Sequence, residues 1–542
     1  MNVMRLGWVR TIRRNWWWIG YVSIFTISFV VLLILQAAPV FADPDSFYHA
    51  KMAILMRDQG VIRSFPWLNL TVLGEHYTDQ HFLYHLILIP FVTWFPPLVG
   101  LKLATVVFGA GVITVAYWMM KRLDVRWPFF FALLLLFSRP FSFRMSLAKA
   151  PSTSLIILLV GLTWIFHYQL KRLWVLAFAY VWYYGGFALL GVGAVTHAVV
   201  SGLHNRFVTR DDSHRFVQKI KALISRGSRN HRVRRLNLGV VVSVLTGLLA
   251  GVIINPYFPK NISFYYHQLI NIGVINFQKV IGVGGEWYPY GLVNLLANGA
   301  FASILLVLAL VCLFLKARQQ TKATWTMFFL TTFFLLLTLK SRRYVEYYVP
   351  IAIIFSAMSI SQALRSIRAQ QAWGEFRRLL LMRRTGQVLF GLAGIFIALS
   401  FGFVAGRDFH NEQRDLQRGF RVDELGPVSR WLAANTPVGS RVVHSDWDEF
   451  PLLFYHNSHN TYIVGLDPTF LYKADKERYW TWANITLGKF TGDVYDAVTT
   501  TLDSRYVLVT NDHTAMDRYF RLNENFVRRY HDTEATIYEA RR

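Results

Sequence analysis

Long apolar runs are the feature that most constrains this chain. The runs extend over about 15 to 26 residues, and a helix needs about 20 residues to cross the hydrocarbon core of a bilayer. Of the 542 residues, 54% are hydrophobic and only 16% are charged. Because backbone groups within lipid must bond to each other, the runs predict helices. The predicted fold class is a polytopic α-helical membrane protein.

The positive charge of the chain follows a membrane pattern. The formal net charge is +26, which alone could indicate a nucleic-acid-binding protein. The lysines and arginines, however, fall almost entirely in alternate loops between the apolar runs, as the positive-inside rule predicts for cytoplasmic loops. The charge therefore indicates basic loops near anionic lipid, and no nucleic-acid partner is expected.

Eleven transmembrane helices satisfy this rule when the arginine-rich N-terminus is placed in the cytoplasm. The block 174–203 has to cross twice, as two short helices that meet near Gly185 and Gly186. This topology predicts a multi-pass protein of the cytoplasmic (inner) membrane with its C-terminal tail outside. The expected helices are 16–40, 99–120, 127–138, 151–169, the two within 174–203, 237–254, 291–315, 324–339, 347–364 and 387–405.

Three segments outside the membrane are too long to be simple connectors. They are the outer loops 41–98 and 255–290 and the C-terminal tail. The tail alternates short helical and β-rich runs, such as "EFPLLFYH" and "SRYVLVTND", which predicts a small α/β domain with a parallel or mixed sheet. We therefore expect a transmembrane module of residues 1–406 and an extracytoplasmic α/β domain of residues 407–542.

Charged side chains in the outer segments are the candidate functional residues. Carboxylates and guanidinium groups at the rim of apolar helices are costly unless solvated or paired, and such sites often handle charged substrates. Each residue could equally be an ordinary solvated loop residue. The residues are Asp43, Asp45, His49, Glu75, His76, Asp79, His81, His85, Glu286, Arg342, Arg343 and Glu346.

Several short motifs resemble the catalytic subunit of oligosaccharyltransferases. The run "DSFYHAK" from Asp45, followed by "MRDQG" and "FPWLN", is similar to the Asp-Pro-aromatic-aromatic run of that family's first outer loop. In "VGGEWYP", Glu286 precedes Pro289 by three residues, as in the family's Ser-Val-x-Glu-x-x-Pro loop. In "RRYVEYYVP", Arg343 precedes Pro350 by seven residues, like the family's arginine that meets the lipid-linked phosphate.

The resemblance extends along essentially the whole chain. In the tail, Trp447 and Asp448 stand where the family carries the second Trp and the Asp of its Trp-Trp-Asp-Tyr-Gly motif. The resemblance implies a GT-C type fold and an inverting glycosyltransferase. Such an enzyme would transfer a sugar or oligosaccharide from a polyprenyl-phosphate-linked donor to an acceptor on the outer face of the membrane. Trp447 and Asp448 would bind that acceptor.

The chemistry of this transfer assigns roles to the outer residues. The departing phosphate gains negative charge as the glycosidic bond breaks, so fixed cations favour the transition state. Arg343, with its neighbour Arg342, is the candidate. An acceptor hydroxyl or amide needs a carboxylate that takes its proton or orients it. Asp45, Asp43 and Glu286 are the candidates, and of the two aspartates only Asp45 falls on the family position.

One acidic motif of the family is missing. Between Asp124 and Asp211 the chain has no Asp or Glu, and "RPFSFRMSLAKAPSTS" stands where the family carries a motif that helps hold a divalent metal. Mg²⁺ and Mn²⁺ prefer several oxygen ligands, so the loss of two carboxylates weakens the case for either ion at Asp45 and Glu286.

Two hypotheses follow from the missing motif. Either the enzyme is metal-independent, with Lys149 or Arg144 supplying positive charge at the donor phosphate, or a metal is held differently, through His81 and His85, which share a helical face. The acceptor motif departs as well, because Asp446 stands in place of its first Trp. The acceptor thus stays open between a glycan, a lipid and a protein. The alternative to an enzyme is a non-catalytic GT-C-fold protein that acts in translocation or assembly of lipid-linked glycans.

Overall fold

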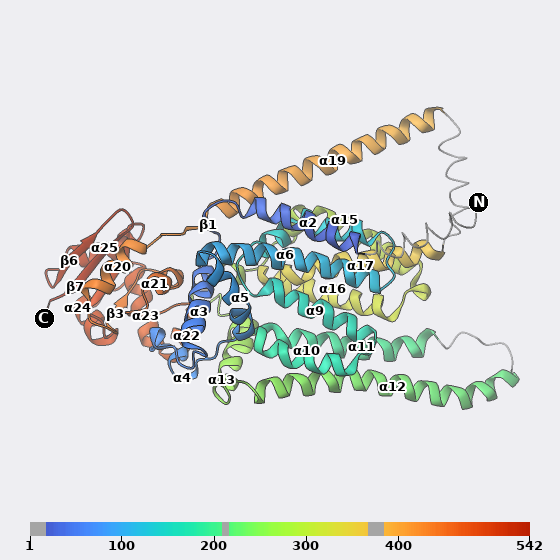
Figure 1. Ribbon diagram of the computed structural model, residues 1–542, viewed down its shortest axis with the longest axis horizontal. Coiled ribbons are helices and arrows are strands. Elements are labelled where there is room, and N and C mark those ends of the chain that lie inside the picture. Colours follow the sequence, from blue (N-terminus) through green and yellow to red (C-terminus); the bar gives the residue numbers. More distant parts are fainter. Residues whose placement is uncertain (1–17, 209–215, 367–383, 542) are drawn as a thin grey trace.

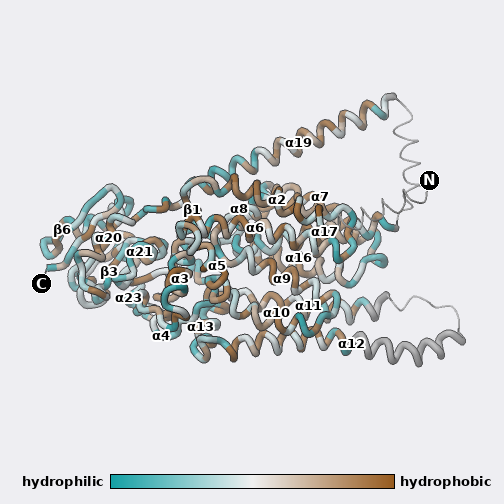
Figure 2. Tube along the Cα trace, in the orientation of Figure 1, coloured by the Kyte–Doolittle hydropathy of each residue, from teal (hydrophilic) through white to brown (hydrophobic). Residues whose placement is uncertain are grey.

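The computed structural model describes residues 18–208, 216–366 and 384–541, and it consists of a helical bundle followed by a smaller domain at one end of the bundle (Figure 1). Hydrophobic residues, brown in Figure 2, are concentrated along the bundle helices. These helices are α2 (Ile19–Leu35), α6 (Pro97–Arg122), α7 (Pro128–Leu133), α8 (Arg139–Met145), α9 (Pro151–Phe166), α10 (Leu170–Tyr183), α11 (Ala188–Val208), α12 (Phe216–Ile253), α14 (Leu292–Asn298), α15 (Ala300–Leu315), α16 (Lys322–Lys340), α17 (Val345–Ser366) and α19 (Arg384–Gln417).

Membrane-spanning helices make up most of the bundle. Among the described residues, six helices are long and apolar enough to cross a membrane, or eight if each of two bent helix pairs forms one span. The apolar helices α2 and α9, of 17 and 16 residues, are slightly shorter. As expected, α10 and α11 meet at the two glycines, in the turn Gly185–Phe187. The protein is thus built on multiple apolar helices, while the count of eleven spans stays a prediction.

The two bent pairs depart from the expected helices. The helix expected over 291–315 is helical but broken, because α14 and α15 meet at 100° at Gly299. The helical segment 128–137 and α8 are bent by 82°. Pro140 lies in the first turn of α8, where its missing N–H costs no helical hydrogen bond, so a new helix begins there. This second bend carries Arg144 into the interior of the protein.

Outer segments lie between the bundle and the C-terminal domain (Figure 1). The first outer loop is tied to that domain, since α3 (Asp45–Gln59) packs on α21 (Phe450–His456) and the Phe47 ring meets Tyr455 edge to face at 5.7 Å. The Trp67 indole also donates a 2.8 Å hydrogen bond to the Ser458 carbonyl. The outer helices are α3 (Asp45–Gln59), α4 (Val72–His76), α5 (Phe82–Trp94) and α13 (Lys260–Tyr266).

A five-stranded mixed sheet forms the centre of the C-terminal domain, with the strand order β4-β3-β5-β7-β6. Strand β3 pairs parallel with β4 and β5, and β7 pairs antiparallel with β5 and β6. The strands are β3 (Arg441–Val443), β4 (Thr461–Tyr462), β5 (Tyr506–Thr510), β6 (Phe526–His531) and β7 (Ala535–Ala540). The helices are α20 (Gly426–Asn435), α21 (Phe450–His456), α22 (Thr469–Ala474), α23 (Lys476–Thr486), α24 (Val494–Asp496) and α25 (Thr514–Arg521).

A short antiparallel ladder joins the bundle to this domain. Strand β1 (Val40–Phe41) pairs with β2 (Phe420–Arg421), just after the end of α19. The expected domain boundary after residue 406 falls inside α19, which continues to residue 417. At Gly419 a Cβ atom would lie 2.0 Å from the Phe41 carbonyl oxygen, so only glycine allows this close approach. The ladder fixes the chain directly before Asp43.

Candidate active site

A cavity of about 660 Å³ lies where the bundle, the outer segments and the C-terminal domain meet. Nearly all of the residues singled out in the sequence as catalytic, phosphate-binding, acceptor-binding or metal-binding line this cavity. The exception is His85, which lies behind its wall. The lining candidates are Asp43, Asp45, His81, Arg144, Lys149, Glu286, Arg342, Arg343, Trp447 and Asp448.

The first charged cluster in the cavity joins Lys149 to two aspartates. Lys149 Nζ lies 2.6 Å from Asp43 Oδ2 and 2.9 Å from Asp45 Oδ2. The helix start brings the two carboxylates together, because Pro44 is the N-cap of α3 and Asp43 Oδ1 accepts a 3.0 Å hydrogen bond from the Asp45 backbone N–H. Acidic groups at a helix N-terminus are favourable. Lys149 comes from the connection between α8 and α9, the segment in which the expected acidic motif was missing.

Burial and charge determine the protonation of this cluster. Burial raises the pKa of Asp45, the Lys149 ammonium lowers it, and the Asp43 carboxylate raises it again, so that the net pKa is above its ordinary value. For Lys149, burial lowers the pKa, but Asp43 and Asp45 raise it by more, so that the ammonium stays charged. With its side chain 28% exposed, Asp45 is more accessible from the cavity than Asp43.

The second charged cluster is centred on Glu286. Its Oε1 lies 2.7 Å from Arg343 Nη1, and its Oε2 lies 2.6 Å from Arg144 Nη1. Arg144 also donates a 2.9 Å hydrogen bond from Nε to Glu346 Oε2, and its Nη2 lies 2.8 Å from the same oxygen as part of the ion pair. Arg343 donates its other Nη to the Tyr184 hydroxyl at 2.9 Å. Two arginines are therefore held in place by carboxylates and a phenol.

Two short 3₁₀ turns position this cluster. The turn Gly285–Trp287 presents Glu286, and the turn Arg342–Tyr344 presents Arg343. The Ser341 hydroxyl donates to the Glu286 carbonyl at 2.9 Å, and the Arg342 backbone N–H donates to the Tyr288 carbonyl at 2.9 Å. The Arg343 guanidinium also lies 4.8 Å from the centroid of a Trp287 ring. The arginine is fixed from three sides.

Glu286 is strongly anionic in this environment. Burial raises its pKa, but Arg343, Lys149 and Arg144 together lower it well below its ordinary value. A carboxylate with so low a pKa is a poor proton acceptor. Glu286 is therefore suited to orienting the arginines, whereas Asp45 is better suited to accepting a proton.

Trp447 and Asp448 form the cavity wall contributed by the C-terminal domain. The Trp447 ring lies next to Gly284 of the second outer loop, where a Cβ added to the glycine would be 3.5 Å from the ring. Burial and the neighbouring Asp446 raise the pKa of Asp448 to about 7. Burial likewise raises the pKa of Asp467, another lining carboxyl, to about 6. An aromatic ring beside carboxyl groups is a surface suited to a hydroxyl-bearing acceptor.

The carboxylates do not fit a hard divalent cation. Mg²⁺ or Mn²⁺ would need about six oxygen ligands. Lys149 contacts one oxygen of each aspartate, and the arginines contact both oxygens of Glu286. A cation held by Asp45 and Glu286 would also lie against the Lys149 ammonium. These contacts favour the metal-independent hypothesis for the carboxylate cluster.

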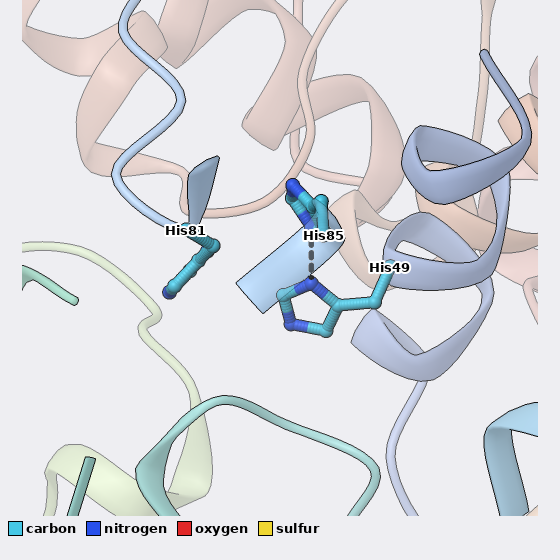
Figure 3. Close-up of side chains that lie close together, drawn as sticks. All are labelled: His49, His81 and His85. Carbon is cyan, nitrogen blue, oxygen red and sulfur yellow. Dashed lines mark hydrogen bonds between the residues drawn. The ribbon is translucent and has the colours of Figure 1, made fainter. Parts of the chain in front are cut away.

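Three histidines lie close together (Figure 3), and two of them, His49 and His81, line the cavity. His49 Nδ1 lies 2.8 Å from His85 Nε2, and His85 Nδ1 lies 2.7 Å from Asp79 Oδ2. His81 stacks on the Tyr184 ring, with 5.7 Å between centroids. Burial lowers the pKa of His49 and of His81 well below the ordinary value, so both rings are neutral at pH 7.

Sequence reasoning missed Tyr184, and it named Glu346 and His49 as candidates without giving them a role in these clusters. Glu346 and Tyr184 hold the arginines, and His49 joins the histidine pair that was expected from spacing alone. Glu346 was visible as an acid at the start of an apolar helix. Tyr184 carries no such signal, because it lies in an aromatic run, "YVWYYGG", among similar side chains.

Comparisons with known proteins bear on the fold. No family model and no curated protein sequence matches the chain. Among solved structures, the Archaeoglobus fulgidus oligosaccharyltransferase AglB, in complex with an inhibitory peptide and a dolichol-phosphate, matches at a TM-score of 0.61 and 13% identity, over 93% of this chain and 71% of that chain. ArnT from Cupriavidus metallidurans, bound to undecaprenyl phosphate, matches at 0.53 and 14% identity, over 96% of this chain and 98% of that chain.

A third solved structure has a similar fold. The mycobacterial arabinofuranosyltransferase AftD matches at a TM-score of 0.51 and 11% identity, over 98% of this chain and 40% of that chain. Identities this low show the fold alone. In fold, the chain resembles the GT-C glycosyltransferases, including the oligosaccharyltransferases among them.

Proposed function

We propose that the protein is a membrane glycosyltransferase that transfers a sugar or oligosaccharide from a polyprenyl-phosphate-linked donor to an acceptor on the outer face of the membrane. The observation that carries this proposal is the cavity in which Arg343 and Arg144, fixed on Glu286, face a pair of aspartates fixed on Lys149. The solved structures of AglB with dolichol-phosphate and of ArnT with undecaprenyl phosphate, which are similar in fold, support a donor of this chemical kind.

The proposed topology places the cavity outside the cytoplasm. It has eleven spans in the cytoplasmic membrane, a cytoplasmic N-terminus and the C-terminal domain on the opposite side. The donor phosphate would then enter the cavity from the outer leaflet. At this level the apolar helices end and the cationic side chains that line the cavity begin. A lipid-linked donor needs a site at that level, because its phosphate stays at the membrane surface.

The proposed reaction is a single displacement at the anomeric carbon, with inversion. The acceptor oxygen or nitrogen forms the new bond, and the bond from the anomeric carbon to the phosphate oxygen breaks, with its electron pair leaving on the phosphate. The acceptor proton passes to Asp45, with Asp43 fixing the ammonium of Lys149 beside it. Arg343 and Arg342 stabilise the charge that develops on the phosphate.

The proposal assigns the role of a hard divalent metal to side-chain cations. Lys149 and Arg144 come from the segment that lacks carboxylates, and both contact the acidic residues that would otherwise converge on a metal. Trp447 and Asp448 would bind the acceptor, which is a glycan, a lipid or a protein. The reaction would then contribute to glycosylation at the cell envelope.

Transfer from defined donors tests the proposal. Purified protein in detergent is incubated with radiolabelled polyprenyl-phosphate and polyprenyl-diphosphate sugars and with envelope extract as acceptor. We expect transfer without added Mg²⁺ or Mn²⁺, and a loss of at least about 100-fold in Asp45→Asn, because such a change removes a general base worth about 10²- to 10⁴-fold. Asp503→Asn, an exposed site in the C-terminal domain, is the control.

Two results would contradict the proposal. Equal activity in Asp45→Asn and the control would show that the cavity is not the reaction site. A stable parent protein that transfers from no donor would favour the alternative, a non-catalytic GT-C-fold protein that acts in translocation or assembly of lipid-linked glycans.

A further inference from the structure

Three histidines converge beside the cavity but take no part in the proposed transfer. One ring nitrogen from each of His49, His81 and His85 lies within 4.8 Å of the other two (Figure 3). They come from separate places on the outer loop: His49 from α3, His81 from the residue before α5, and His85 from the first turn of α5. His49 and His81 line the cavity, so the cluster has one open side.

Asp79 organises the cluster from behind. Its buried carboxylate accepts from His85 Nδ1 at 2.7 Å through Oδ2 and from the His81 backbone N–H at 2.9 Å through Oδ1. Because a carboxylate can only accept, the proton of His85 lies on Nδ1, and its Nε2 offers a lone pair toward His49. A carboxylate behind a histidine is the arrangement that orients metal-binding imidazoles in proteins.

We propose that His49, His81 and His85 bind one divalent transition metal ion, with Zn²⁺ the best fit and one coordination position open to the cavity. Imidazole nitrogens suit Zn²⁺ and not Mg²⁺. Zinc–nitrogen bonds of about 2.0 to 2.1 Å put tetrahedral ligand nitrogens about 3.4 Å apart. His49 Nδ1 donates its proton to His85 Nε2 at 2.8 Å; on metal binding this proton would move to His49 Nε2, the two nitrogens would separate slightly, and His81 would move closer.

The site gives α3 a fixed point close to the reacting groups. His49 follows Asp45 by four residues, which is about one helical turn. A metal that joins His49 to the start of α5 therefore fixes the end of α3 that presents Asp45. This positioning role rests on the proposed function, whereas metal binding does not. Zn²⁺ binding and sugar transfer are measured separately, so a failure of the metal site can be distinguished from a failure of the proposed function.

Metal binding to the full chain tests the site. Protein purified without a histidine tag is stripped with a chelator, dialysed and titrated with Zn²⁺ by calorimetry, and with Co²⁺ by visible absorption. We expect one ion per chain, the visible bands of tetrahedral Co²⁺, and a higher melting temperature with Zn²⁺ but not with Mg²⁺. His85→Ala and His81→Ala should lose the site, and Asp79→Asn should bind about 10- to 100-fold more weakly.

A matched control uses a histidine on the same outer loop. His76→Ala, at a half-exposed position in α4, should bind Zn²⁺ like the wild type. If His85→Ala fails to fold, His81→Asn replaces a less buried ring and keeps the test intact. No stoichiometric Zn²⁺ binding, or wild-type affinity in a folded His81 variant, would overturn the proposal.

Discussion

Lys149 occupies the place where two carboxylates would otherwise repel each other. Asp43 and Asp45 both direct an oxygen at its ammonium, and the ammonium is largely buried. Removing one partner of a buried ion pair costs about 3 to 5 kcal/mol, because the other charge is left without compensation. The same neutralisation is provided by a metal ion in sites where carboxylates converge.

Exchange of this lysine tests whether it stands in for a metal. Lys149→Met should lower transfer at least about 100-fold, a loss of about 2.7 kcal/mol of transition-state stabilisation. Lys149→Asp places a third carboxylate beside Asp43 and Asp45, so Mn²⁺ should restore part of the activity of this variant and none of that of Lys149→Met. The measurement is the transfer rate of each variant with and without Mn²⁺. Equal responses of the two variants to Mn²⁺ would contradict the substitution of a metal by Lys149.

Asp448 gives the protein a pH-dependent stability that can be measured. The pKa of this carboxyl is about 7 in the folded protein, against an ordinary value of 3.8. Between these values the folded state binds more protons than the unfolded state, so stability falls as the pH rises from about 4 to about 7. In Asp448→Asn the melting temperature should fall less over this range. If the melting temperatures of the two proteins changed by the same amount between pH 4.5 and pH 8, the raised pKa of Asp448 would be contradicted.

At the level of elements, the β1–β2 ladder controls how the C-terminal domain meets the bundle. The ladder places Asp43 two residues beyond Phe41, whose carbonyl oxygen lies 2.0 Å from the position that a Cβ on Gly419 would take. A side chain at this position requires the two strands to separate. The ladder therefore couples the position of the C-terminal domain to the first charged cluster, which contains Asp43.

A glycine exchange tests this coupling. Gly419→Ala should lower the melting temperature and raise proteolysis between α19 and the C-terminal domain, because about 1 to 3 kcal/mol is lost when a packed position is overfilled. Gly406→Ala is the control, since no atom lies within 4 Å of its Cβ position in α19. Alanine has a higher helix propensity than glycine, so this control should not destabilise α19. Gly419→Ala with unchanged melting and proteolysis would show that the ladder does not hold the domain.

The sequence predicted the positions of the helices better than it predicted which residues contact one another. Apolar runs located the helices, and the paired glycines marked the junction of α10 and α11, because such signals are local. The bend at Gly299 was missed, since the apolar pattern continues through it. The ion pair between Arg144 and Glu286 joins residues 142 positions apart. Only the packing of the whole bundle determines such a pair, so charge alone could nominate these residues but not connect them.

On the scale of the whole molecule, helix α17 separates two chemically different ends. Its 22 residues extend over about 33 Å, close to the thickness of a hydrocarbon core. Arg343, in the cavity, lies just before its first residue. Near its other end Ser361 accepts a 2.9 Å hydrogen bond from the backbone N–H of Arg126, in the basic turn "KRLDVR". The cavity and this basic turn therefore lie on opposite sides of the membrane in the proposed topology.

Cysteine labelling tests which side faces outward. Cys312, in α15, is the single cysteine of the chain, so Cys312→Ser gives a background without thiols. Leu522→Cys, at an exposed position of the C-terminal domain, should react with a membrane-impermeant maleimide in intact cells. Gln319→Cys, exposed in the basic turn after α15, should react only after permeabilisation, because the positive-inside rule places that turn in the cytoplasm. The reverse pattern would place the cavity on the cytoplasmic side, where a donor in the outer leaflet could not reach Arg343.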